Sequence, residues 1–316
     1  MRAQRRHPVV RLDRLVAPLL AMTIAALAAS ARADPQPVCG GLTVPLHLDQ
    51  SGSPIAHLAL AGKEGDFLID TGSTISIVDA DAFGILPHQR VTLKGFSLPT
   101  VAEGSFQVWD WLAHDRSIIG TDILRTRTVE IHYGPSEPYL ALSEGSCAAA
   151  ALEGAGFARI DQKGFYGAES RRKPNLPVVF VRIGRVTALF YLDTGRGDFT
   201  DGGLLAISEP YHDLLAKDGV AMDHVRTSHV SDCRGEDSEA EVVRTPGGRM
   251  AILSRVGGAE VASYDAPPLM VLPEGAVCGN RNAPTQPFGL IGASFLRKWG
   301  TVIIDPFAQA LWIKAG

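Results

Sequence analysis

The sequence has no excess of positive charge. Its 316 residues include 30 lysines and arginines against 34 aspartates and glutamates, which gives a formal net charge of -4. A chain with this balance does not attract nucleic-acid phosphates by bulk charge, so a strongly basic nucleic-acid-binding protein is excluded. The function is therefore expected to depend on local motifs.

Two motifs that mark common classes of enzyme or binding protein are also missing. The chain has no Gly-x-Ser-x-Gly motif, so the nucleophile turn typical of α/β-hydrolases is missing. Gly154-Ala155-Gly156 does not have the strand and helix context of a phosphate-binding loop. Serine-hydrolase and nucleotide-binding functions are therefore not predicted.

Metal-ligand residue types are sparse and poorly grouped. The four cysteines form no closely spaced pair of the kind that zinc sites prefer. Asp223, His224, His229 and Cys233 could supply ligands, but their spacing is unremarkable and the stretch is polar. A solvated surface is the more ordinary interpretation, and we predict no metal and no cofactor.

Stretches with helical periodicity are also few, whereas glycine and proline are plentiful, at 33 and 20 residues. Short apolar or alternating segments such as Leu42–Leu48, Val178–Ile183 and Leu269–Leu272 are typical of β-strands. Leu204–Lys217 is the main predicted helix, and residues 218–258 are polar and expected to include exposed loops. The length suffices for about two domains of roughly 100–200 residues each.

The N-terminus has the pattern of a secretory signal peptide. Several arginines precede an apolar, alanine-rich run over residues 15–31, and Ala31-Arg32-Ala33 offers small residues where a signal peptidase cleaves. We predict a signal peptide over residues 1–33 and export to the periplasm or the medium. An uncleaved membrane anchor is the alternative.

One tripeptide, Asp-Thr-Gly, occurs twice. Asp70-Thr71-Gly72 and Asp193-Thr194-Gly195 each follow an apolar, strand-like run. Each is followed later by two aliphatic residues and a glycine, in Ile118-Ile119-Gly120 and Leu290-Ile291-Gly292. Both glycines lead into a short helix-like segment and a β-rich tail, which indicates an internal duplication.

The duplication divides the predicted mature chain into two lobes, over residues 34–147 and 175–316, with a linker over residues 148–174. The basic run Arg171-Arg172-Lys173 fits a solvated linker, although a processing site or an anion-binding patch would have the same composition. Residues 302–313 are expected to form a hairpin that closes the second lobe.

The cysteines fit this division. Among three connectivities, Cys39–Cys147 with Cys233–Cys278 keeps each bridge within one lobe. Export makes oxidation of these thiols expected. Free thiols or a metal cluster are the alternatives.

With both motifs in view, the sequence resembles the aspartic peptidases of the pepsin-like and retropepsin-like clan, in particular bacterial-type exported members. The resemblance covers nearly the whole mature chain and is strongest around the two tripeptides and the two later glycines. It implies an all-β fold with two pseudo-symmetric β-barrel lobes and a cleft between them. It also implies an endopeptidase that acts on peptide or protein substrates, as a monomer, without a cofactor, nucleic acid or membrane.

By this resemblance, Asp70 and Asp193 form the catalytic pair. Two carboxyl groups brought together cannot both ionise easily, so they share a proton, and the charged member can activate a water molecule for attack on a peptide bond. Such a pair titrates as a unit, so neither residue is assigned one role from the sequence.

The resemblance also implies roles for the neighbouring residues. Thr71 and Thr194 are expected to brace the two loops with their hydroxyls, and the amides of Gly72 and Gly195 to hold the carboxylates. Gly120 and Gly292 are expected to pack behind the loops. Ser73 fits the family's small hydroxyl position after the first tripeptide, whereas Arg196 departs from its counterpart after the second.

The departure at Arg196 leaves a second function open. A guanidinium group beside a carboxylate favours its charged form, so Arg196 could perturb the shared proton and leave a non-catalytic peptide-binding module. The first lobe also has no tyrosine between Asp70 and Gly120 for a substrate-covering flap. Trp109 or Trp111 could replace it, or both could pack in the core.

Overall fold

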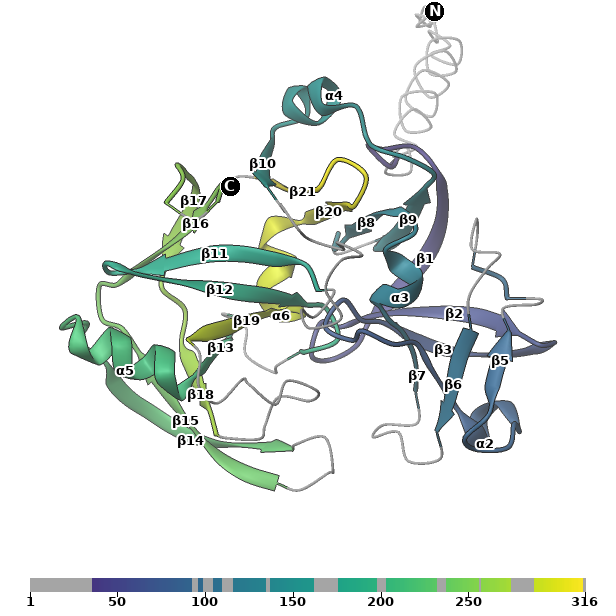
Figure 1. Cartoon of the computed structure of the whole chain (residues 1–316), viewed down its shortest axis with the longest axis horizontal. Helices are drawn as coiled ribbons and strands as arrows, with labels where there is room; N and C mark the ends of the chain where they lie inside the picture. Colours follow the sequence, from purple (N-terminus) through teal and green to yellow (C-terminus); the bar gives the residue numbers. More distant parts are fainter. Residues whose placement is uncertain are drawn as a thin grey trace, which may run out of the picture. The chain divides into compact units, whose positions relative to one another are not determined.

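The structure is a computed structural model that describes residues 36–92, 96–98, 105–109, 116–134, 137–161, 176–197, 203–231, 237–255, 257–273 and 287–314. By its internal contacts, Pro37–Gly316 is one unit. This unit is built mainly from β-strands in two large sheets, so the predicted all-β class is confirmed (Figure 1). The predicted signal peptide lies outside the described residues.

The first sheet joins strands from both ends of the chain. Its 12 described strands run in the order β10-β21-β20-β8-β9-β1-β2-β3-β7-β4-β6-β5. Their bounds are β1 Leu42–Leu48, β2 Pro54–Leu60, β3 Lys63–Ile69, β4 Ile77–Asp79, β5 Arg90–Thr92, β6 Ser105–Trp109, β7 Ser117–Ile119, β8 Thr128–His132, β9 Tyr139–Ser143, β10 Phe157–Asp161, β20 Thr301–Asp305 and β21 Ala310–Lys314.

The second sheet contains residues from the second half alone. Its nine described strands run in the order β14-β15-β18-β13-β19-β12-β11-β16-β17. Their bounds are β11 Val178–Ile183, β12 Val186–Asp193, β13 Leu205–Ser208, β14 Asp223–Ser231, β15 Asp237–Arg244, β16 Arg249–Leu253, β17 Glu260–Asp265, β18 Leu269–Leu272 and β19 Phe288–Gly292.

The described helices are short and lie between strands. They are α2 Ala80–Phe83, α3 Thr121–Leu124, α4 Ala149–Gly154, α5 Glu209–Lys217, α6 Ala293–Leu296 and the 3-10 helix η2 Arg297–Trp299. No helix in the described part of the chain is long and apolar enough to cross a membrane.

The predicted internal duplication is visible in the strand order. In the first half β3 pairs in parallel with β7, β7 is antiparallel to β4, and β4 is parallel to β6. In the second half β12, β19, β13 and β18 repeat the same order and the same directions. The helices α3 and α6 follow β7 and β19 at matching places, so the two halves share one plan.

The C-terminal hairpin differs from its prediction. β20 and β21 form the expected antiparallel pair, but β20 also pairs with β8 of the first half and β21 with β10. The hairpin therefore completes the first sheet rather than closing the second. β10 belongs to the segment predicted as a linker, which also contains α4. Pairing distant segments satisfies backbone groups that a lobe-by-lobe arrangement would leave at an edge.

Two other expectations change in the second half. The start of the predicted helix Leu204–Lys217 is β13, and α5 begins only at Glu209. All four residues of β13 are buried, and a short apolar run of this kind does not distinguish strand from helix. The polar stretch expected to include loops also contains β14, β15 and β16. β14 and β15 form a hairpin at the edge of the sheet, where polar side chains can be exposed, whereas β16 is mostly buried.

The core fixes the strands that carry the two tripeptides. Phe67 on β3 is fully buried, and its ring lies 5.4 Å from those of Phe83 and Phe96 and 5.7 Å from that of Phe106. On β12, buried Phe190 packs edge-on against Tyr211, at 5.6 Å. Burial of each such ring is worth about 1.5–3 kcal/mol, so both strands are firmly anchored.

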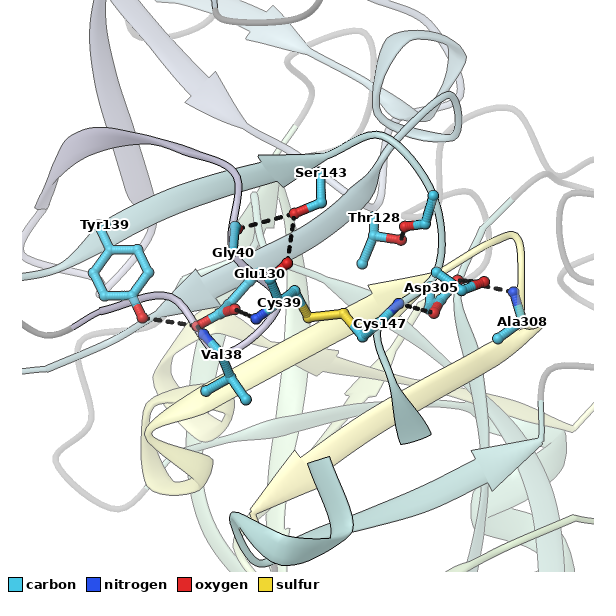
Figure 2. Close-up of a disulfide and its surroundings, with 12 residues drawn as sticks. Val38, Cys39, Gly40, Thr128, Glu130, Tyr139, Ser143, Cys147, Asp305 and Ala308 are labelled. Atoms are coloured by element: carbon cyan, nitrogen blue, oxygen red, sulfur yellow. Dashed lines mark hydrogen bonds between the residues drawn. A yellow bond between two sulfur atoms is a disulfide. The ribbon is translucent and has the colours of Figure 1, made fainter. Parts of the chain in front are cut away.

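The first predicted disulfide is confirmed. Cys39 and Cys147 are bonded, and buried carboxylates lie on both sides of the bond (Figure 2). Glu130 accepts hydrogen bonds from the Cys39 amide at 3.1 Å and the Tyr139 hydroxyl at 2.7 Å, and Asp305 accepts from the Cys147 amide at 3.0 Å. Cys233 and Cys278 lie outside the described residues, so their pairing stays a prediction.

Candidate active site

The two aspartates stand at equivalent ends of strands. Asp70 directly follows β3, and its amide donates to the carbonyl oxygen of Ile119 on β7 at 3.0 Å. Asp193 is the last residue of β12 and lies opposite Gly292 in the parallel pairing with β19. A parallel strand beside each motif thus holds each aspartate at the carboxyl end of an interior strand.

Reciprocal hydrogen bonds join the two threonines. The Thr71 amide donates to the Thr194 hydroxyl at 2.9 Å, and the Thr194 amide donates to the Thr71 hydroxyl at 3.1 Å. The Thr71 hydroxyl donates to the Leu192 carbonyl at 2.8 Å, and the Thr194 hydroxyl to the Ile69 carbonyl at 2.5 Å. Both side chains are fully buried, so the loops are braced against each other without competition from water.

The brace brings each carboxyl group onto the opposite motif. A Cβ atom added to Gly72 would overlap the carboxyl group of Asp193, and one added to Gly195 would overlap that of Asp70. Only glycine permits this approach. The tertiary structure therefore brings together two acids that are 123 positions apart in the chain, like the two threonines beside them.

Backbone amides hold the carboxylates in place. Gly72 donates to Asp70 Oδ1 at 2.8 Å, and Arg196 donates to Asp193 Oδ1 at 2.9 Å. The Gly195 amide also lowers the pKa of Asp193 by hydrogen bonding. The second loop thus uses the amide of Arg196 in addition to that of the predicted glycine.

The electrostatics of the two acids differ. Burial and the charge of Asp193 raise the pKa of Asp70 well above its ordinary value. Burial also raises the pKa of Asp193, but the positive charge of Arg196 opposes the rise. The hydrogen bond between the two side chains raises the pKa of Asp70 and lowers that of Asp193, as expected when protonated Asp70 donates to ionised Asp193.

The later glycines lie directly behind the loops. A Cβ atom on Gly120 would overlap the carbonyl group of Ile75, and one on Gly292 would overlap the carbonyl oxygen of Arg196. The residue after each glycine bonds to the same loop, since the Thr121 amide donates to Ser73 and the Ala293 amide to Arg196, at 2.8 and 2.7 Å.

Ser73 and Arg196 occupy equivalent positions with different contacts. The Ser73 hydroxyl donates to the carbonyl oxygen of Ile75 at 2.7 Å and thus stabilises its own turn. The Arg196 guanidinium reaches Met270, with Nη2 3.5 Å from the sulfur. Arg196 also lines a pocket of about 230 Å³ that borders the second loop.

Sequence reasoning missed two supports of the loops. The Ser76 hydroxyl donates to Asp122 at 2.6 Å and accepts from the Gly120 amide at 2.9 Å. Asp49 accepts from Arg116 at 2.7 Å and organises a turn whose Ser53 hydroxyl donates to the carbonyl oxygen of Gly195 at 3.3 Å. Asp122, two residues after Gly120, was the one signal available, whereas the Asp49 turn had none.

The structure describes only some of the remaining candidates. Trp109 is half-buried on β6, which pairs with β4 and β5, and Trp111 lies outside the described residues. The described residues contain no cluster of three or more metal-ligand side chains, and Cys233 is not among them.

Comparison with known proteins shows similarity to solved structures. No family model matches the chain, and neither does any curated protein. Among solved structures, the chain is similar to the crystal structure of aspartic proteinase from Irpex lacteus, at 12% sequence identity and a TM-score of 0.47, over 87% of this chain and 97% of that chain.

Proposed function

We propose that the protein is an aspartic endopeptidase that hydrolyses peptide bonds with a water molecule activated between Asp70 and Asp193. The observation that carries the proposal is the placement of each carboxyl group against the glycine of the opposite motif. Two acids held this closely share a proton, which is the arrangement that aspartic proteases use for acid–base catalysis.

Because different charges act on the pKa values of Asp70 and Asp193, we assign the proton to Asp70 and the negative charge to Asp193 at the start of the reaction. Ionised Asp193 takes a proton from water as the water oxygen bonds to the peptide carbonyl carbon. Asp70 gives its proton to the carbonyl oxygen, so that a neutral tetrahedral diol forms. The diol then returns a hydroxyl proton to Asp70, Asp193 protonates the leaving nitrogen, and the C–N bond breaks. An acid and an amine leave, and both aspartates regain their starting states.

The contacts of Arg196 favour catalysis over the alternative of a non-catalytic peptide-binding module. Its positive charge lowers the pKa of Asp193, but burial outweighs this effect and the pKa stays above its ordinary value. The pair therefore keeps a shared proton, which the reaction requires.

We also propose that the protein is exported and acts as a monomer on peptide or protein substrates. The Cys39–Cys147 disulfide supports export, because disulfides persist in oxidising compartments. The two motifs of one chain meet in one site, so a second copy is not needed to build it.

The test is a digestion of an unbiased peptide library across a range of pH, read by mass spectrometry. Asp70→Asn and Asp193→Asn should each lower kcat/KM by roughly 10²–10⁴-fold, because each removes a proton-transfer group. Asp66→Asn, which removes the same charge from an exposed position on β3, is the matched control and should retain activity.

Cleavage that persists in both dyad variants would exclude the proposed mechanism. Correctly folded wild-type protein that binds peptides without cleaving them at any pH would instead support the peptide-binding module. Circular dichroism of each variant separates loss of chemistry from loss of folding.

A further inference from the structure

The pocket of about 230 Å³ begins at the second catalytic loop. Its lining includes Arg196 and Gly197, which follow the Asp-Thr-Gly motif, and Gly292, which lies opposite Asp193 in the sheet. From there it extends to Met270 on β18 and to the edge strand β14. The pocket therefore adjoins the loop that carries Asp193.

The lining combines an apolar floor with positive charge. Leu204, Ala206 and Met270 belong to a buried apolar cluster that also includes Ala240 and Val242 of β15. Arg196 and Arg226 supply two guanidinium groups, with Ser228 and His229 beside them. Among the residues that the structure describes, the lining contains no acidic side chain.

The strand register places Glu239 and Glu241 off the face that carries Arg226 and Ser228. Arg226 and Ser228 on β14 lie opposite Val242 and Ala240 on β15, which are buried in the apolar cluster. The acidic residues Glu241 and Glu239 alternate with them and therefore lie on the other face of the hairpin. On that other face, His224 Nδ1 lies 3.1 Å from Glu241 Oε1, so this carboxylate is paired with His224 rather than with Arg226.

We propose that this pocket is a subsite that binds a carboxylate of the peptide substrate, and that the enzyme prefers an acidic group close to the scissile bond. The inference rests on the proposed endopeptidase function and adds the substrate class. Arg226 is the specificity-determining residue, because it faces the pocket from outside the catalytic loops. Guanidinium groups match carboxylate geometry, and the apolar floor receives the methylene groups of an acidic side chain.

The test uses matched peptides with blocked ends that carry Glu, Gln or Lys in turn at each of the three positions on either side of the scissile bond. At one of these positions the wild-type protein should cleave the Glu peptide about tenfold faster in kcat/KM than the Gln peptide. Arg226→Gln should reduce this ratio to near unity by slowing cleavage of the Glu peptide. Arg226→Glu should favour the Lys peptide.

Arg244→Gln is the matched control, since it removes the same charge from an exposed position of the same hairpin outside the pocket. It should keep the wild-type Glu preference. A second peptide pair with a free or amidated C-terminus, both lacking acidic side chains, separates recognition of a terminal carboxylate from that of a side chain.

Equal cleavage of Glu and Gln peptides at every position, together with equal cleavage of the free-acid and amide peptides, would overturn the subsite. Equal effects of Arg226→Gln and Arg244→Gln would overturn the role of Arg226. If the protein cleaves no peptide, fluorescence anisotropy with the same peptides measures binding to the subsite alone. Tighter binding of the Glu or free-acid peptide, lost in Arg226→Gln, would support the subsite. Equal binding of the matched peptides would reject it.

Discussion

At the scale of single residues, Arg196 makes two otherwise similar aspartates unequal. Both acids lie at the end of an apolar strand and accept hydrogen bonds from backbone amides, but only Asp193 has a guanidinium group three positions later in the chain. Burial raises the pKa of both acids; the charge of Arg196 opposes this rise at Asp193, whereas the charge of Asp193 adds to it at Asp70. The proton is therefore expected to reside on Asp70.

Replacing Arg196 with glutamine should move the acidic limb of the pH profile to higher pH. Asp193 must be ionised for activity, and loss of the cation raises its pKa, so the active form appears only at higher pH. The measurement is kcat/KM against pH with a peptide that lacks acidic side chains, which separates this effect from recognition in the pocket.

Arg185→Gln is the control for this prediction. Arg185 is exposed in the turn between β11 and β12 and pairs with Asp218 at 2.8 Å, so its loss removes a charge without touching the aspartates. An unchanged acidic limb in Arg196→Gln, or one displaced to lower pH, would contradict the role given to Arg196.

At the scale of elements, the site depends on two strand-and-loop units fastened to each other. Each unit has a hairpin whose second strand ends at the tripeptide and a parallel strand that ends at the later glycine. The buried threonine hydroxyls form hydrogen bonds that connect the two units at the site. Precise placement of the acids should therefore depend on these hydroxyls rather than on either unit alone.

Thr71→Ala should cost about 1–3 kcal/mol of unfolding free energy, because it leaves the buried Thr194 amide without its acceptor. It should also lower kcat/KM, whereas Thr71→Ser keeps the hydroxyl and should restore most of both properties. Denaturant unfolding and steady-state kinetics measure the two effects.

Thr187→Ala tests whether any threonine on these strands has the same effect. Thr187 is exposed on β12 and should change stability by less than about 0.5 kcal/mol. If Thr71→Ala and Thr71→Ser were equally impaired, the threonine methyl group rather than the hydroxyl would be the important contact.

At the scale of the whole molecule, the chain ends hold the first sheet together. β20 and β21 from the C-terminus pair with β8 and β10, while the segment before β1 is tied to the segment before α4 by Cys39–Cys147. Buried Glu130 and Asp305 accept hydrogen bonds from the backbone amides of the two cysteines (Figure 2). The disulfide therefore closes a long loop at a site that the surrounding carboxylates also stabilise.

Removing this bond should destabilise the protein by about 2–4 kcal/mol, because the cysteines are 108 positions apart and the bond restricts a large part of the unfolded chain. The measurement is equilibrium unfolding of the Cys39→Ser/Cys147→Ser double variant. Each single variant should be equally destabilised, since either one breaks the same bond. Stability equal to that of the wild type would contradict the prediction.

Much of the site was predictable because its residues belong to a repeated local pattern. The two tripeptides, the two later glycines and the preceding apolar strands are short-range features that the repeat makes specific. Arg196 was also recognisable as a departure from the pattern. The Asp49 turn was not predictable, because it reaches the second loop only through the contact between Ser53 and Gly195. The cationic pocket was not predictable either, because Arg196 and Arg226 come together only through the pairing of β14, β15, β18 and β13.

The amino-acid sequence by itself determined the all-β class and the duplication, because strand alternation and repeated motifs can be read along the chain. It favoured the Cys39–Cys147 pair among three connectivities, and the structure decided it. Only the tertiary structure decided that the C-terminal hairpin completes the first sheet, that Leu205–Ser208 is a strand, and that each carboxyl group lies against the opposite glycine. These outcomes depend on which distant backbone groups pair and which side chains are buried together, and no local pattern specifies that choice.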